Sequence, residues 1–213
     1  MKNKFYMSMV IIMMMLVNSS CGQSINSNNV AKAQTLVNQA GALMMSASAG
    51  EEEKVTLNKA VDLLKKSIEL NDTVNVAAQS LIICYIRLKE PQKAIDICTQ
   101  WLKKFPKDEN ARLQRGMLYY SSKEFTLADS DFDIIKAYLA KQNPTFSSNL
   151  APAEINKIIN LSFLNVVVGN QEHAIYLIDH LKTALPKNTI VDRAYLDMQK
   201  TTRDDVIRKF TGF

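Results

Sequence analysis

Apolar residues recur along most of the chain at the three- and four-residue spacing of an amphipathic helix, and short polar breaks separate these stretches. Glycine and proline are scarce, which favours helices over a turn-rich β fold. The pattern predicts helices over residues 30–45, 56–70, 152–168 and 171–184, a polar loop over residues 46–53, and one or two helices within residues 191–210. The sequence therefore predicts an all-α protein.

Matching positions in the middle of the chain are separated by 34 residues. Tyr85 and Tyr119 form one such pair, and Ala94 and Ala128 form another. In both units a polar break divides two apolar stretches, as expected for two antiparallel helices. Further on, Ala174 and Pro186 repeat the spacing of Ala94 and Pro106, after about twelve extra residues around residues 141–151. Asp108 is placed to cap a helix, and Pro91 suits a first helical turn.

These marks resemble the tetratricopeptide repeat family. The matching residues are the first-helix tyrosines Tyr85 and Tyr119, the small first-helix residue Gly116, the second-helix alanines Ala94 and Ala128, the aromatic Phe132 and the closing proline Pro106. Ile82 and Trp101 depart from the family, which usually has small residues at both places. The resemblance implies an α-solenoid of about four antiparallel helix pairs that ends in a C-terminal capping helix.

The start of the chain resembles a bacterial lipoprotein signal peptide. Two lysines precede an apolar run over residues 5–17, which is too short to span a bilayer. Ser19 and Ser20 then lead to Cys21, as at the site where the family's cysteine is acylated and becomes the new N-terminus. Asn18 departs from the aliphatic residue usual there. An ordinary secretory signal with a chance cysteine and an uncleaved anchor are the alternatives.

This resemblance predicts three segments. We expect a signal peptide over residues 1–20, a flexible polar tether over residues 21–29, and a helical repeat domain over residues 30–213. Acyl chains on Cys21, such as palmitate, would anchor the protein to a membrane. Gly22 follows Cys21 where inner-membrane lipoproteins often have Asp, so we expect the outer membrane, with the protein facing the periplasm.

The charge and the reactive residues indicate no enzyme. The formal net charge is +5, and no basic stripe with interleaved aromatic residues is present, so nucleic acid is not an expected partner. His173 and His180 are seven residues apart on one predicted helix, about 10 Å, which is too far to share a metal ion. The acidic run over residues 51–53 is interpreted as a solvated loop. We expect no catalytic residues, no metal and no cofactor.

Three residues leave alternatives open. Cys84 and Cys98 lie on the two helices of one predicted repeat, where they could form a disulfide or act as two small buried apolar residues. Trp101 could offer a flat surface to a sugar or pack between helices.

The family resemblance also implies a binding groove, because first helices of successive repeats line its concave face. The corresponding residues here are Gln79, Ile83, Ile86, Leu113, Met117, Tyr120, Ile159, Phe163 and Val166. This mostly apolar set could bind an unidentified protein or peptide, be filled by the chain's own segment from Val191 onward, or be ordinary core. We expect a membrane-anchored protein–protein interaction module, a scaffold or adaptor of the bacterial cell envelope. The alternative is a substrate-capture lipoprotein of a nutrient-uptake system.

Overall fold

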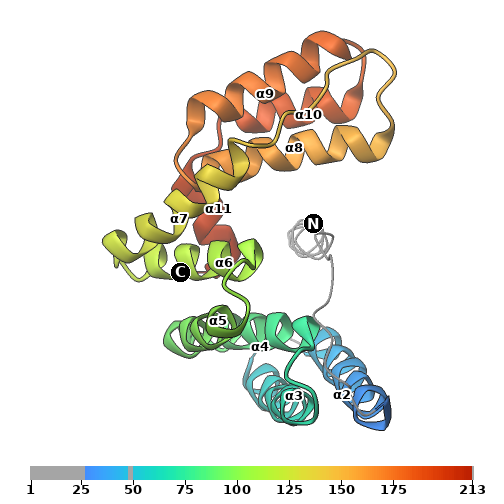
Figure 1. Cartoon of the computed structure of the whole chain (residues 1–213), viewed down its shortest axis with the longest axis vertical. Helices are drawn as coiled ribbons and strands as arrows, with labels where there is room; N and C mark the ends of the chain where they lie inside the picture. The colour runs from blue at the N-terminus through green and yellow to red at the C-terminus, as the bar shows by residue number, and fades with distance from the viewer. Residues whose placement is uncertain (1–26, 48–49, 213) are drawn as a thin grey trace. The chain divides into compact units, whose positions relative to one another are not determined.

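A computed structural model of the chain describes residues 27–47 and 50–212, so the predicted signal peptide, Cys21 and most of the tether lie outside the described residues. The described part holds ten helices and no strand, which confirms the predicted all-α class (Figure 1). The helices are α2 Ser27–Ser46, α3 Glu51–Leu70, α4 Asn75–Arg87, α5 Pro91–Lys104, α6 Glu109–Ser121, α7 Phe125–Leu139, α8 Pro152–Val167, α9 Gln171–Ala184, α10 Thr189–Met198 and α11 Arg203–Thr211. Across these residues, no helix combines the length and apolar character that a membrane crossing needs.

The predicted helix boundaries are confirmed in most places and wrong in two. The extra residues around 141–151 form a linker between α7 and α8, and α9 covers residues 171–184 as predicted. However, α2 begins at Ser27, inside the predicted tether. The predicted loop over residues 46–53 is also too long, because Glu51–Glu53 form the first turn of α3. Carboxylates are favourable at a helix N-terminus, where the backbone N–H groups and the helix dipole attract negative charge.

One type of turn joins the two helices of three successive pairs. Its left-handed residue is Lys89 between α4 and α5, Lys123 between α6 and α7, and Gly169 between α8 and α9, with φ of 61°, 64° and 80°. In each turn the next residue's N–H donates to a carbonyl five residues back, at 2.9, 2.9 and 2.7 Å. This arrangement satisfies carbonyls at the end of the first helix. The structure thus repeats the same hairpin at the positions where the sequence pattern recurs.

A second type of turn leads from one pair to the next. Between α5 and α6, Asp108 caps the new helix by accepting a hydrogen bond from the Ala111 N–H at 3.0 Å, as predicted. Between α9 and α10, Asn188 accepts from the Val191 N–H at 3.2 Å. The preceding helices end alike, with the N–H of Phe105 and of Leu185 bonded four residues back.

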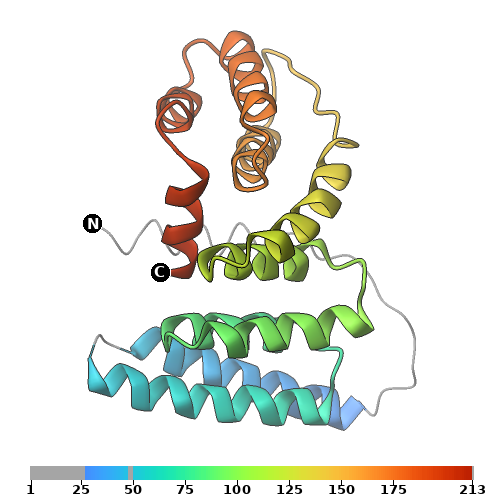
Figure 2. The same cartoon turned by 90° about the vertical axis from the view of Figure 1, so that its left-hand side faces the viewer.

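The described chain divides into two compact units, residues 27–118 and 119–211, with the boundary inside α6. In the N-terminal unit, α2 packs on α3, α3 on α4 and α4 on α5, as the blue-to-green helices of Figure 2 show. In the C-terminal unit, α8 packs on α9, α9 on α10, and α11 contacts α8. Each unit therefore stacks consecutive helices in the manner of an α-solenoid. The largest fully buried side chains include Leu64 and Leu81 in the first unit and Ile158 and Leu177 in the second.

Candidate functional site

The nine predicted groove residues lie on α4, α6 and α8, and the structure leaves none of them fully exposed. Six are buried, namely Gln79, Ile86, Leu113, Met117, Ile159 and Val166. The other three, Ile83, Tyr120 and Phe163, are half-buried. Their role in binding a partner therefore stays a prediction, and only the half-buried residues reach the surface of the chain in this conformation.

In the C-terminal unit, the helix α11 lies against two of the elements that carry these residues. It contacts α8, and its second residue, Asp204, accepts a hydrogen bond from the Tyr120 hydroxyl at 2.6 Å. This hydrogen bond is the main reason why the pKa of Tyr120 is raised above its ordinary value, with burial and the negative charge of Asp204 adding to it. The chain's own C-terminal segment thus lies against Tyr120, in agreement with one of the three interpretations that the sequence left open.

Arg203, the first residue of α11, is held between two aromatic rings. Its guanidinium carbon lies 4.4 Å from the centre of the Tyr120 ring and 4.5 Å from that of Phe132. It also donates a hydrogen bond to Asp129 of α7 at 3.3 Å. A Cβ added to Gly169 would lie 3.5 Å from the guanidinium, so the α8–α9 turn passes directly beside it. Filling of the groove at Tyr120 by the segment from Val191 onward was one open interpretation, but no feature of the sequence pattern singled out Arg203 or its contacts with Phe132 and Asp129.

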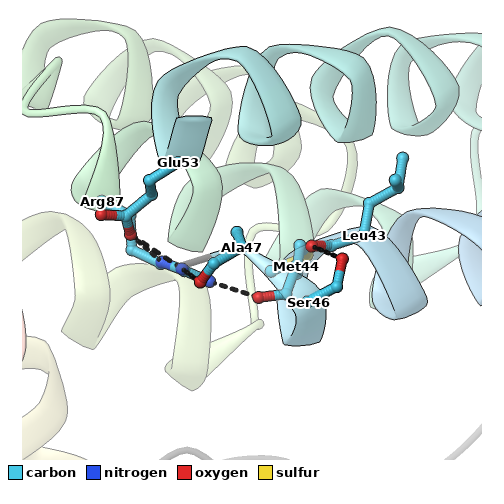
Figure 3. A network of polar contacts seen from close by, with 6 residues as sticks. All are labelled: Leu43, Met44, Ser46, Ala47, Glu53 and Arg87. Atoms are coloured by element: carbon cyan, nitrogen blue, oxygen red, sulfur yellow. Dashed lines mark hydrogen bonds and ion pairs between the residues drawn. The ribbon is translucent and has the colours of Figure 1, made fainter. Parts of the chain in front are cut away.

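A second polar network joins the first three helices of the N-terminal unit (Figure 3). Arg87, the last residue of α4, donates two hydrogen bonds to Glu53 Oε1, at 3.0 and 2.8 Å. It also donates to the Met44 carbonyl at 2.7 Å and to the Ala47 carbonyl at 3.2 Å. One guanidinium therefore caps the end of α2 and binds the first turn of α3. Arg87 was not among the predicted site residues either, although the acidic run at the start of α3 was a signal for a basic partner.

The two cysteines of the described chain are buried, and no disulfide joins them. The interpretation of Cys84 and Cys98 as small buried apolar residues is confirmed. Burial raises the pKa of the Cys84 thiol to about 12, against a smaller lowering by the positive charge of Arg87. A thiol with this pKa stays protonated at neutral pH, so Cys84 is not suited to nucleophilic chemistry.

Trp101 packs between helices and offers no platform to a ligand. Its side chain is 8% exposed and belongs to an apolar cluster with Ala78 of α4 and Ala111 of α6. The indole N–H donates to Asp108 Oδ2 at 2.7 Å, and the Phe105 ring lies 4.4 Å from the tryptophan ring. The packing interpretation of Trp101 is therefore confirmed.

The histidines belong to a row of rings on α9. Tyr176 is 46% exposed and lies between His173, at 5.6 Å, and His180, at 4.0 Å between ring centres. Phe146 of the α7–α8 linker contacts His180 at 5.4 Å. The row therefore attaches the linker to α9. Within the described residues, no group of three side chains could hold a metal ion.

Comparison with known proteins shows only distant similarity. No protein-family model and no curated protein sequence matches the chain. Among solved structures, a mutant of the protein MamA aligns over 86% of this chain and 94% of its own, with 17% identity and a TM-score of 0.42. A tetratricopeptide repeat protein from Parabacteroides merdae aligns over 83% of this chain and 73% of its own, with 18% identity and a TM-score of 0.41. The fold assignment therefore rests on the chain's own helices and turns.

Proposed function

We propose that this protein is a membrane-anchored protein–protein interaction module of the bacterial cell envelope. The observation that carries the proposal is the tandem use of one hairpin turn, at Lys89, Lys123 and Gly169. Helix pairs built in tandem present extended surfaces that suit recognition of another polypeptide. We expect the partner to be a protein or peptide, and we expect neither enzymatic activity nor a cofactor.

The anchor is the second part of the proposal. It is supported by the apolar run over residues 5–17 followed by Ser19, Ser20 and Cys21. Acylation of Cys21 would hold the helical units at a membrane, and we place them at the periplasmic face of the outer membrane. Nutrient capture remains the alternative, and the single tryptophan does not support it, because this residue is buried between helices.

The anchor is tested by mass spectrometry of the mature N-terminus and by membrane fractionation. We expect a chain that begins at an acylated Cys21 and that fractionates with membranes. The Cys21→Ala variant should keep an unmodified N-terminal region and lose most of its membrane association. An identical membrane fraction for the variant, or a wild-type Cys21 without lipid, would refute the anchor while leaving the interaction module intact.

The interaction is tested by affinity purification of the tagged protein from detergent-solubilised envelopes. A matched lipoprotein with the same tag and an unrelated fold serves as the control. We expect a protein that co-purifies with this chain and is absent from the control. Recovery of the chain alone, after crosslinking as well as without it, would contradict the proposal.

A further inference from the structure

The helix α11 occupies a surface made by the last turn of α6, by α7 and by α8 in the C-terminal unit. We propose that α11 is a displaceable occupant of this surface, and that the surface takes an amphipathic helix of the same pattern from a protein partner. The inference rests on the proposed function, because it states what kind of polypeptide the module binds.

The pattern that the surface accepts can be read from α11 itself. Its apolar side is Val206, Ile207 and Thr211, all of which are buried. Its other side carries Arg208 and Lys209, which are exposed. The matching ligand is a helix with an arginine in its first turn and branched apolar residues three and four positions later.

The start of α11 is capped by residues of its own segment. Thr202 and Asp205 make a capping box, with the Asp205 N–H donating to Thr202 Oγ1 at 3.1 Å. Thr202 in turn donates from its hydroxyl and its backbone N–H to Asp205 Oδ2, at 2.7 and 3.3 Å. These bonds satisfy the first turn from within the segment. The cap can therefore stay intact when α11 leaves its surface.

Among the polar contacts that hold α11, the hydrogen bond from Tyr120 to Asp204 is short at 2.6 Å, whereas those of Arg203 are weak. The ion pair from Arg203 to Asp129 is long at 3.3 Å, and the Asp129 side chain is 57% exposed, so solvent screens it. The Arg203 Nε is buried without a hydrogen-bond partner, which is unfavourable for a charged group. Arg203 is therefore held mainly by its ring contacts with Tyr120 and Phe132.

The α8–α9 turn lies beside Arg203, and its left-handed residue is smaller than that of the α4–α5 and α6–α7 turns. The left-handed position is lysine in the α4–α5 and α6–α7 turns and glycine in the α8–α9 turn. Gly169 has no side chain, and a Cβ there would already touch the Arg203 guanidinium. A long side chain at residue 169 would compete with the arginine for this space. The surface is thus shaped around an arginine at the start of the bound helix.

Tethering determines how a partner competes with α11. The linker Gln199–Thr202 is four residues long, so α11 is present at its surface at an effective concentration on the order of millimolar. A free helix of equal affinity would therefore bind the wild-type chain only weakly. Weakening the tethered helix should open the surface to a free one.

The test uses the full-length protein and a fluorescent peptide of residues 199–212. We expect the peptide to bind the Arg203→Ala protein about tenfold more tightly than the wild type, because the tethered competitor is weakened and the peptide keeps its arginine. Hydrogen exchange should show residues 203–211 opening more often in Arg203→Ala, with α8 and α9 unchanged. Arg208→Ala, which alters the exposed side of α11, should behave as the wild type in both measurements.

Three results would overturn the proposal. The first is equal exchange protection of α11 and α8 in the wild type, which would make α11 part of one cooperative core. The second is an open α11 in Arg203→Ala without binding of the peptide. The third is a dimer that exchanges α11 between copies. If Arg203→Ala fails to fold, Ile207→Ala replaces it, since this change removes buried apolar contacts from α11 and leaves the surface on α6, α7 and α8 unchanged. Peptide binding is measured without any cellular partner, so its outcome is independent of the co-purification experiment.

Discussion

At the scale of single residues, Arg87 links three helices of the N-terminal unit through hydrogen bonds. It bonds to one carboxylate and to two carbonyls from the end of α2 (Figure 3). Replacing it with methionine keeps much of the side chain's apolar stem but leaves these acceptors without their donor. Because the arginine side chain is 30% exposed and water can replace part of the loss, we expect a cost of about 1–3 kcal/mol in unfolding free energy.

Urea denaturation measures this cost, and Lys93→Met is the matched control. Lys93 forms an ion pair with Glu90 on the surface, and its loss should leave the unfolding midpoint almost unchanged. An Arg87→Met protein as stable as the control would mean that the network in Figure 3 does not hold α2 and α3 together.

The raised pKa of the Cys84 thiol should make the stability of the fold depend on pH. Its pKa in the folded chain is about 12, whereas an unfolded cysteine ionises near its ordinary value of about 8.5. As the pH rises above this ordinary value, the unfolded state loses its proton first, so the free energy of unfolding falls until the folded thiol also ionises. Between pH 8 and pH 10 the wild type should therefore lose more stability than Cys84→Ala. A native-state maleimide reaction at Cys84 as fast as in urea would contradict the burial on which this rests.

Residues whose roles depend on nearby backbone, such as helix caps and first-turn prolines, could be predicted from the sequence. Asp108 was predicted as a cap because its acceptor lies three residues from the N–H it binds, and Pro91 because its place in a first turn is set by the backbone. Arg87 and Arg203 could not be predicted in this way. Their partners lie 34 to 83 residues away, and several of those partners are backbone carbonyls or aromatic faces that no residue pattern marks.

At the scale of elements, the repeated turn gives a matched pair of substitutions. Lys123 adopts a left-handed conformation that suits glycine better than lysine, so Lys123→Gly should leave the stability unchanged or raise it by about 0.5–1 kcal/mol. Gly169 adopts the same conformation, and Gly169→Ala should cost about 1–2 kcal/mol. Thermal or urea unfolding of the two variants measures both effects. A Lys123→Gly protein less stable than the wild type, or a Gly169→Ala protein as stable as the wild type, would show that the two turns are not equivalent.

The element boundaries show where pattern analysis succeeds and where it fails. The span of α9 was predicted to the residue, because polar breaks bound a clean apolar period on both sides. The predicted start of α3 was wrong. The three consecutive glutamates were interpreted as a solvated loop, although negative side chains are favourable at a helix N-terminus. Helix-terminal electrostatics, which add no apolar periodicity, decide that boundary.

At the scale of the whole molecule, the fold class was predictable and the exposure of the groove residues was not. A 34-residue period implies stacked helix pairs whatever the individual side chains are. Burial depends on what packs across each face, and the sequence pattern does not contain that information. Met117, for example, is 1% exposed, so a charge placed there would disrupt the core rather than test a surface. α11 likewise covers part of α8 through contacts made at long range.

The most direct test of the central claim is photo-crosslinking in cells from the three half-buried first-helix positions. A photoreactive amino acid replaces Ile83, Tyr120 or Phe163 in turn, and Met45, which is largely exposed at the end of α2, is the control position. We expect at least one of the three positions to capture a distinct protein that Met45 does not, and we expect this protein to be lost in the Cys21→Ala chain. Capture of no protein from any of the three positions, or of the same proteins from Met45, would contradict the account of this chain as an anchored interaction module.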